Sequence, residues 1–195
     1  MSAPSHGGPI LTLEPFLDAV RDGLEGEGWE LSGLQKTTSY EFEGRWAGES
    51  SRSAYLFFHR EDVPEWASID AFLDETSRGL KGNLALVLDG PVLAKIPDPG
   101  RAMEGLTVLA RDALPDGYRA PLTLRFRLPN LGEEAARADT EIRFKLLFPS
   151  EAMRSGFSAV SALAATVARA FQEIMRSPGL QPYWPEGDGS GSLGV

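Results

Sequence analysis

Basic residues in two strand-like segments form the most distinctive chemical pattern of this chain. Arg125 and Arg127 alternate with apolar residues in the first segment, and Arg143 and Lys145 do so in the second. Successive side chains of a strand point to opposite faces of a sheet, so each basic pair is expected to lie opposite its apolar neighbours. A hairpin of these two strands would gather four cations on one surface, which destabilises the pairing unless an anion balances them.

Two sources of that balancing anion stay open. One source is the chain itself, through the candidate carboxylates Glu41, Glu43, Glu133, Glu134 and Glu141. The other source is an acidic patch on a partner protein, or an anionic ligand, that meets the basic surface by charge complementarity. In the second case, the predicted partner-binding site consists of Arg125, Arg127, Arg143 and Lys145.

A second candidate site is an aromatic pocket between the sheet and the helices. Alternation along residues 54–59 puts Tyr55, Phe57 and His59 on one face of a strand, opposite a fully apolar face. With aromatic residues from the preceding strand-like segment, the candidate pocket comprises Tyr40, Trp46, Tyr55, Phe57 and His59. A small molecule would bind there if polar groups converged inside the pocket.

Known catalytic and metal-binding motifs are missing. The chain has no cysteine and two histidines, which excludes disulfides, thiolate zinc sites and cysteine nucleophiles. No Walker A sequence is present. Residues 156–160 begin like a nucleophile elbow, but they lack its closing glycine and fall inside an expected helix. We therefore expect no catalytic residue, no metal and no cofactor, and an enzyme is the less favoured interpretation.

The charge balance argues against a nucleic-acid partner. Among 195 residues, 19 are basic and 28 are acidic, which gives a net charge of −9 and repels a phosphate backbone. Hydrophobic residues make up 42% of the chain, enough for an ordinary globular core. The sequence shows neither a signal-peptide pattern nor an apolar run of about 18 residues. We therefore expect a cytoplasmic protein that does not bind membranes.

The last expected helix, over residues 150–175, has an unusual second face. One face is apolar and suits a core, whereas the other carries small, uncharged residues over several turns. A solvated helix face normally carries charge, so this face is expected to be covered by the rest of the chain or by a second subunit. For the second case we predict a homodimer whose interface includes Ser158, Ala162, Ala165 and Arg169.

The elements that would position these residues predict an α+β fold with antiparallel strands and about four helices. Helices are expected near residues 13–25, 68–80, 99–114 and 150–175. Strands are expected near residues 29–35, 38–46, 54–59, 84–88, 92–96, 119–128 and 140–148. The order of elements is also that of small acidic secretion chaperones, an analogy of order alone without a shared motif.

Two similar junctions suggest an internal duplication. Residues 20–24 (VRDGL) resemble residues 110–114 (ARDAL), and a Gly-aromatic pair follows each of them. We predict two copies of a helix–strand–strand–helix unit related by a pseudo-twofold axis, over residues 11–97 and 98–182, sharing one core. A flexible lead-in (1–10) and a flexible tail (183–195) would flank them. The alternative is that similar helix-to-strand junctions attract similar residues.

These observations favour a non-enzymatic protein-binding module, such as a chaperone, an adaptor or an immunity-type inhibitor. It would act through the basic hairpin face, through the last helix, or through both. The alternative is a small-molecule-binding or enzymatic α+β domain that uses the aromatic pocket. A deep cavity with converging polar groups would favour the alternative, whereas an exposed basic or apolar patch would favour the binding module.

Overall fold

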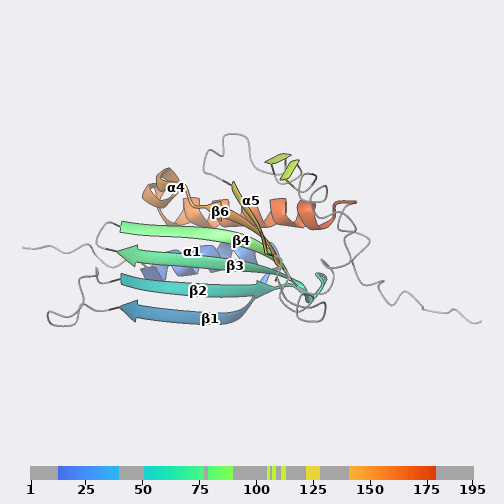
Figure 1. Cartoon of the computed structure of the whole chain (residues 1–195). Coiled ribbons are helices and arrows are strands. Elements are labelled where there is room, and N and C mark those ends of the chain that lie inside the picture. The colour runs from blue at the N-terminus through green and yellow to red at the C-terminus, as the bar shows by residue number, and fades with distance from the viewer. Residues whose placement is uncertain are drawn as a thin grey trace, which may run out of the picture.

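Alternating apolar residues build one six-stranded antiparallel sheet in this computed structural model. The structure describes residues 13–39, 51–76, 79–89, 122–127 and 141–178, together with 105, 107, 108, 111 and 112. The strands are β1 (Glu30–Ser39), β2 (Ser51–His59), β3 (Ala67–Thr76), β4 (Gly79–Asp89), β5 (Leu122–Arg127) and β6 (Glu141–Leu147). Their order across the sheet is β1-β2-β3-β4-β6-β5 (Figure 1). The predicted α+β class and antiparallel pairing are therefore confirmed.

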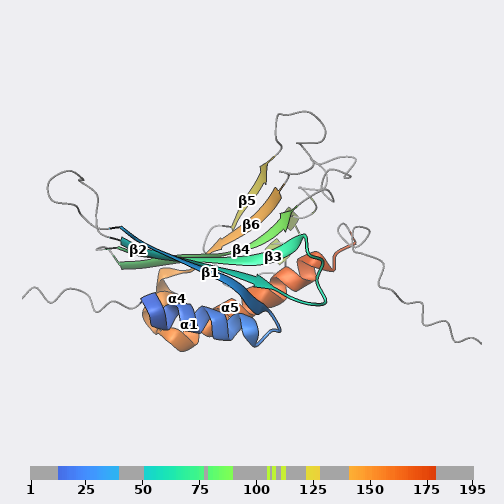
Figure 2. The same cartoon turned by 90° about the horizontal axis from the view of Figure 1, so that it is seen from below.

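Two long helices cover one face of the sheet. Helix α1 (Leu13–Glu25) precedes the first strand, and α5 (Phe157–Met175) follows the last one directly after the short α4 (Ser150–Ser155). Figure 2 shows the three helices on the same side of the sheet, which bends so that β5 and β6 rise away from them. We call the side of the sheet that these helices leave uncovered the open face.

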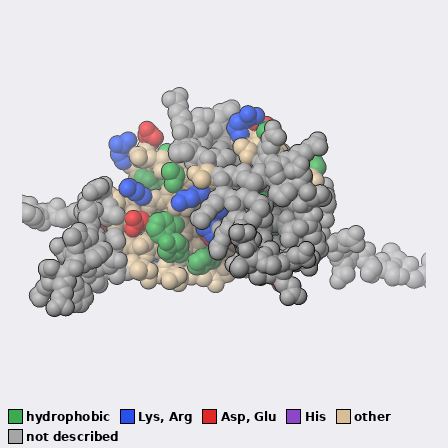
Figure 3. Space-filling model, viewed as in Figure 1, with side chains coloured by type: hydrophobic (Ala, Val, Ile, Leu, Met, Phe, Trp, Pro, Cys, Tyr) green, Lys and Arg blue, Asp and Glu red, His purple; other side chains and the backbone are tan. Residues whose placement is uncertain are grey.

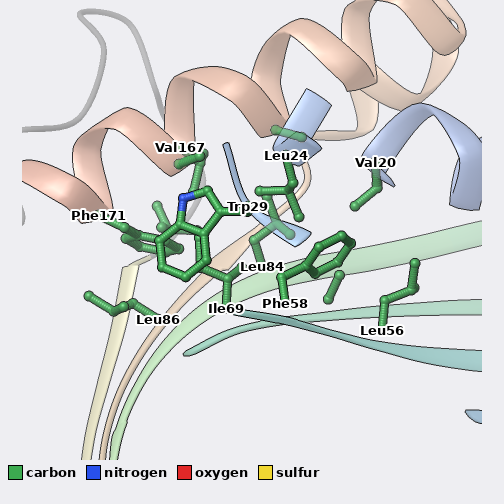
Figure 4. Packing of buried hydrophobic residues seen from close by; sticks show 14 of the residues in the cluster. Val20, Leu24, Trp29, Leu56, Phe58, Ile69, Leu84, Leu86, Val167 and Phe171 are labelled. Carbon is green, nitrogen blue, oxygen red and sulfur yellow. The ribbon is translucent and has the colours of Figure 1, made fainter. Parts of the chain in front are cut away.

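The hydrophobic core fills the space between the sheet and the two long helices. Trp29, Phe58 and Phe171 are fully buried within it, and Figure 4 shows the Trp29 ring beside Phe171 and Val167 of α5. The predicted alternation along β2 is confirmed, because its helix-facing residues Ala54, Leu56 and Phe58 are all buried. Burial of such side chains contributes about 1.5–3 kcal/mol each to folding.

Glycine ends α1 as the sequence predicts. Gly28 has φ +83°, a conformation that other residues rarely adopt. Around it, the Trp29 amide donates to the Leu24 carbonyl at 3.1 Å, and the Gly28 amide donates to the Glu25 carbonyl at 2.9 Å. These two bonds form a Schellman motif, which satisfies the last carbonyls of the helix and sends the chain directly into β1.

The two long helices approach each other most closely at Gly23. A Cβ atom added at this position would lie 2.3 Å from the Ser161 carbonyl oxygen and 2.9 Å from the Ala164 Cβ atom. Small residues on both helices therefore let the backbones meet. The small residues of α5 are explained in part by this contact with α1 of the same chain.

An arginine ties α1 to two strands. Arg52 of β2 donates to both carboxylate oxygens of Glu14, at 3.1 and 3.0 Å. It also donates from Nη2 to Glu75 Oε2 of β3 at 2.7 Å. The Glu75 side chain is only 8% exposed, so this cation balances a carboxylate that burial would otherwise destabilise.

The prediction of a helix over residues 68–80 is wrong. This segment instead forms β3 and the start of β4. Its apolar residues Ile69, Phe72 and Leu73 fit a helical period, but Ile69, Ala71 and Leu73 also alternate as in a strand. The structure uses the second pattern, with β3 paired on both sides, to β2 and β4. Tertiary pairing overrides a local pattern that fits both periods.

That correction bears on the proposed duplication, which is not confirmed. The first unit would need a helix where β3 lies. The two hairpins β1–β2 and β5–β6 do occupy opposite edges of the sheet, each with its first strand outermost. The two halves meet where β4 pairs with β6. The division at residues 97 and 98 stays a prediction, and the expected lead-in, tail and strand over residues 92–96 lie outside the described residues.

Other boundaries follow the sequence with smaller changes. Residues 105, 107, 108, 111 and 112 are helical, within the helix expected over residues 99–114. The single helix expected over residues 150–175 is instead broken at Gly156, where φ is 97°. In the described parts of the chain, no helix combines the length and apolar character needed to cross a membrane. The cytoplasmic location stays a prediction.

Candidate binding site on the open face

The open face of the sheet carries polar and aromatic side chains in cross-strand rows. One row runs through Phe57, Asp70, Ala85, Lys145 and Thr123, one residue from each of β2, β3, β4, β6 and β5. The adjacent row runs through Tyr55, Phe72, Asn83 and Leu147. Directly paired residues of antiparallel strands project from the same face, so strand pairing alone brings these positions together.

A hollow of about 550 Å³ lies over these rows. Its lining residues come from β2 to β6 and are Tyr55, Asp70, Phe72, Asn83, Thr123, Arg143 and Lys145. The upward bend of β5 and β6 makes this side of the sheet concave (Figure 2). Figure 3, which looks onto the same face, shows hydrophobic side chains next to Lys or Arg side chains.

One side of the hollow is aromatic. The rings of Tyr55 and Phe72 are cross-strand neighbours with centroids 4.5 Å apart and planes tilted by 37°. Tyr55 remains 41% exposed, an unusual position for a large aromatic side chain in the middle of a sheet. Aromatic residues that keep one surface free are typical anchors of binding sites.

The other side of the hollow is basic. Arg143 of β6 reaches across β4 to Asp70 of β3, and its Nη2 atom lies 3.2 Å from Asp70 Oδ2. Ala85 of β4 lies between these two strands and is buried although it belongs to the open face. Lys145, by contrast, forms no ion pair with any residue in the described part of the chain. Its ammonium group therefore lines the hollow without a balancing carboxylate there.

The predicted partner-binding residues occupy one face of the sheet by register. Arg125 is the direct partner of Arg143, and Arg127 is the direct partner of Glu141. The side chains of Arg125 and Arg127 lie outside what the structure describes. Of the carboxylates suggested by the sequence, Glu141 is thus a neighbour of one arginine, while Glu41, Glu43, Glu133 and Glu134 lie outside the described residues. Whether this surface binds a partner stays a prediction.

Asp70 is the carboxylate that sequence reasoning missed. Its segment was assigned to a helix, so its position beside the basic strand could not be foreseen. Phe72 and Asn83 were missed for the same reason, since they join the hollow only through the pairing of β3 with β4. The useful signal was the two-residue period of apolar residues along residues 69–73.

The predicted aromatic pocket is corrected in position. Tyr55, Phe57 and His59 do alternate together along β2, but their positions lie on the open face and not between the sheet and the helices. The helix-facing positions of β2 are filled by core residues. Tyr40 and Trp46 lie outside the described residues. Of the three candidates that the structure describes, only Tyr55 lines the hollow.

The residues predicted for a dimer interface border a second groove, between α1 and α5. Ser158, Ala162 and Ala165 line this groove of about 630 Å³, and α1 and its last turn contribute Asp18, Asp22 and Glu27. Arg169 does not line it and forms an ion pair with Glu27 of the same chain. Asp18 and Asp22 form ion pairs with Arg21. A second copy on this surface stays a prediction.

Neither a metal site nor a similarity to known proteins identifies a function for the described part of this chain. Within the described ranges, no group of three or more His, Cys, Asp or Glu side chains could hold a metal ion. No protein-family model, no curated protein and no solved structure matches the chain. The open face and its hollow are therefore the candidate functional site of this chain.

Proposed function

We propose that this protein is a non-enzymatic protein-binding module that holds an acidic segment of a partner protein on its open face. The observation that carries the proposal is Lys145, which lines the hollow beside the Tyr55–Phe72 pair and has no carboxylate partner in the described part of the chain. A chaperone, an adaptor or an inhibitor could all use such a surface, because each needs reversible binding and no chemistry.

Charge complementarity supports an acidic partner. The chain as a whole has a net charge of −9, yet backbone register gathers four basic positions on the β5–β6 end of the open face. A local basic surface on an acidic protein orients an acidic partner and repels it elsewhere. Tyr, Phe and Arg, which all occur on this surface, are also enriched at protein interfaces.

The lining of the hollow gives little support to catalysis. Its described residues include no histidine and no cysteine. Neither the Tyr55 nor the Thr123 hydroxyl forms a hydrogen bond with any described residue, so no activated nucleophile is assembled there. Binding is therefore the simpler use of these side chains.

The test is capture of partners from the source cell with tagged wild-type protein, followed by affinity measurement with the purified partner. Lys145→Glu should weaken this binding at least about tenfold at low salt, and high salt should reduce the difference. Arg154→Glu makes the same charge change on an exposed position of α4 and serves as the matched control. A partner that binds wild type and Lys145→Glu equally would refute the open face as the binding surface.

A small-molecule-binding domain is the second candidate, favoured by the size of the hollow. Its volume of about 550 Å³ falls in the range of about 300–1,000 Å³ typical of ligand pockets. Thermal unfolding in the presence of a library of small carboxylic acids distinguishes the two functions. A compound that raises the melting temperature of the wild type but not of Lys145→Glu, with no protein partner captured, would favour this candidate.

A further inference from the structure

We infer that the hollow on the open face is an anchor for one acidic residue and for the aromatic residue two positions after it in an extended partner segment. The inference rests on the proposed function and names the chemistry that the hollow recognises. It is carried by three polar groups without described partners beside an aromatic pair, all within one hollow.

The described lining of the hollow carries two cations, Arg143 and Lys145. Arg143 is already engaged by Asp70 at 3.2 Å, so the positive charge in the hollow that has no described counterpart is that of Lys145. One ammonium group matches one carboxylate. A phosphate group, with its higher charge, is typically bound by bidentate arginines or several cations, and the described lining does not provide that set.

Thr123 and Asn83 add two hydrogen-bond donors to the part of the hollow that Lys145 lines. Thr123 is its direct partner on β5, and Asn83 lies one row away on β4. Both line the hollow, and neither forms a hydrogen bond with a described residue. An ammonium, a hydroxyl and an amide from three strands thus line one hollow, and each can donate to a carboxylate, whose two oxygens offer about four acceptor sites.

Tyr55 and Phe72 form the aromatic wall of the hollow. Phe72 is the direct partner of Asn83, and Tyr55 is the direct partner of Phe72. A carboxylate held near Asn83 and Lys145 therefore has the aromatic pair one to two strands away, at about 4.8 Å per strand. Side chains two residues apart in an extended segment point to the same side and lie about 6–7 Å apart, so the ring of the second residue after the acidic one would pack on the exposed surface of Tyr55.

The test uses a short peptide with both groups and two peptides that each lack one. The full-length protein, labelled with 15N, is titrated with capped Gly-Asp-Gly-Phe-Gly, Gly-Asn-Gly-Phe-Gly and Gly-Asp-Gly-Ala-Gly while amide chemical shifts are recorded. We expect saturable shifts at Asn83 and Lys145 with the first peptide, at a Kd of about 1 mM. Each of the other two peptides should bind about tenfold more weakly, because each loses one of the two contacts.

Variants tie the binding to the hollow. Lys145→Met and Tyr55→Ala should each weaken the first peptide about tenfold, whereas Lys36→Met, an exposed position on β1, should leave it unchanged. Three results would each overturn the inference. They are equal binding of the Asp and Asn peptides, chemical-shift changes confined to the helices, and no binding at about 10 mM peptide, ten times the expected Kd.

The peptide anchor and the protein-binding function can fail independently of each other. If a captured partner depends on Lys145 but the peptides do not bind, the open face is the interface and the acidic–aromatic anchor is wrong. If the first peptide binds the hollow but no protein partner depends on it, the recognition chemistry holds and the protein-binding function fails.

Discussion

Arg52 is a residue whose loss should destabilise the fold through two ion pairs. Its guanidinium serves Glu14 and Glu75, and Glu75 is almost fully buried. Arg52→Met should lower the free energy of unfolding by about 2 kcal/mol, because a buried carboxylate loses a charged donor. Arg21→Met removes ion pairs of an exposed arginine with its helix neighbours and should cost about 0.5 kcal/mol or less. Urea denaturation compares the two variants, and equal losses would contradict this account.

Glu14 makes the same cluster sensitive to acid. The hydrogen bond from Arg52 holds the pKa of the Glu14 carboxyl below its ordinary value. The folded state therefore binds this proton less readily than the unfolded state. The contact stabilises the protein above the unfolded pKa and is lost as the pH falls through the folded pKa.

We accordingly expect Glu14→Gln to be slightly destabilised at pH 7, by about 0.5 kcal/mol, since the Glu14 side chain is half exposed. The difference from wild type should vanish when the pH is lowered below the folded pKa of Glu14. Chemical denaturation at both pH values measures it, and a constant difference would show that the lost contact is not electrostatic.

At the scale of elements, the contact of α1 with α5 depends on Gly23. Gly23→Ala should destabilise the protein by about 1–3 kcal/mol, because the added methyl group meets backbone and Cβ atoms of α5 that have little room to move. Gly105→Ala is the matched control in another helical position, where a Cβ atom would meet nothing within 4 Å. It should be neutral or stabilising by up to about 1 kcal/mol. Melting temperatures decide, and a stable Gly23→Ala variant would argue against close packing.

The elements with one clear period were predictable from the sequence. The apolar stripe of α1, its glycine end, and the alternation along β2 and β6 each satisfy a single template. Residues 69–73 satisfy two templates, and the choice between them depends on pairing with β2 and β4, which no local window contains. The break at Gly156 was missed because its apolar neighbours continue the helical period on both sides.

The candidate site was predictable only in part, for a related reason. The basic positions of β5 and β6 follow from alternation within a hairpin. The Asp70–Arg143 pair instead requires β4 to lie between β3 and β6. Strand order of that kind is set by how the whole chain packs, so the sequence revealed the charges but neither the counterion nor the aromatic wall.

At the scale of the whole molecule, the predicted homodimer can be tested more sharply. The groove that borders Ser158, Ala162 and Ala165 is also lined by three carboxylates of α1 and its last turn. Asp18 and Asp22 are paired with Arg21, and Glu27 is paired with Arg169, so association through the groove should change little between low and high salt. Sedimentation at tens of micromolar protein, in low and high salt, measures this dependence.

Ala162→Glu should abolish that association while leaving the fold intact, because Ala162 is exposed on α5. Arg169→Glu is a poorer variant, since it would also break the ion pair with Glu27. Gln35→Glu, at an exposed position of β1 away from the groove, adds the same single charge and is the matched control. A wild type that sediments as a monomer at both salt concentrations would rule out the dimer.

The burial of Trp29 has a consequence for how the chain reaches this structure. The side chains beside its ring include Phe171 and Val167, from the far end of the sequence (Figure 4), and β6 must pair with β4 across residues 90–140. Contacts so distant in sequence close large loops and form slowly. During synthesis, residues 13–89 would emerge with their helix-facing side covered by α1 alone until α5 leaves the ribosome. In a variant whose other tryptophans, Trp46, Trp66 and Trp184, are replaced by Phe, the fluorescence of Trp29 would therefore report the final step of folding, when the last helix docks.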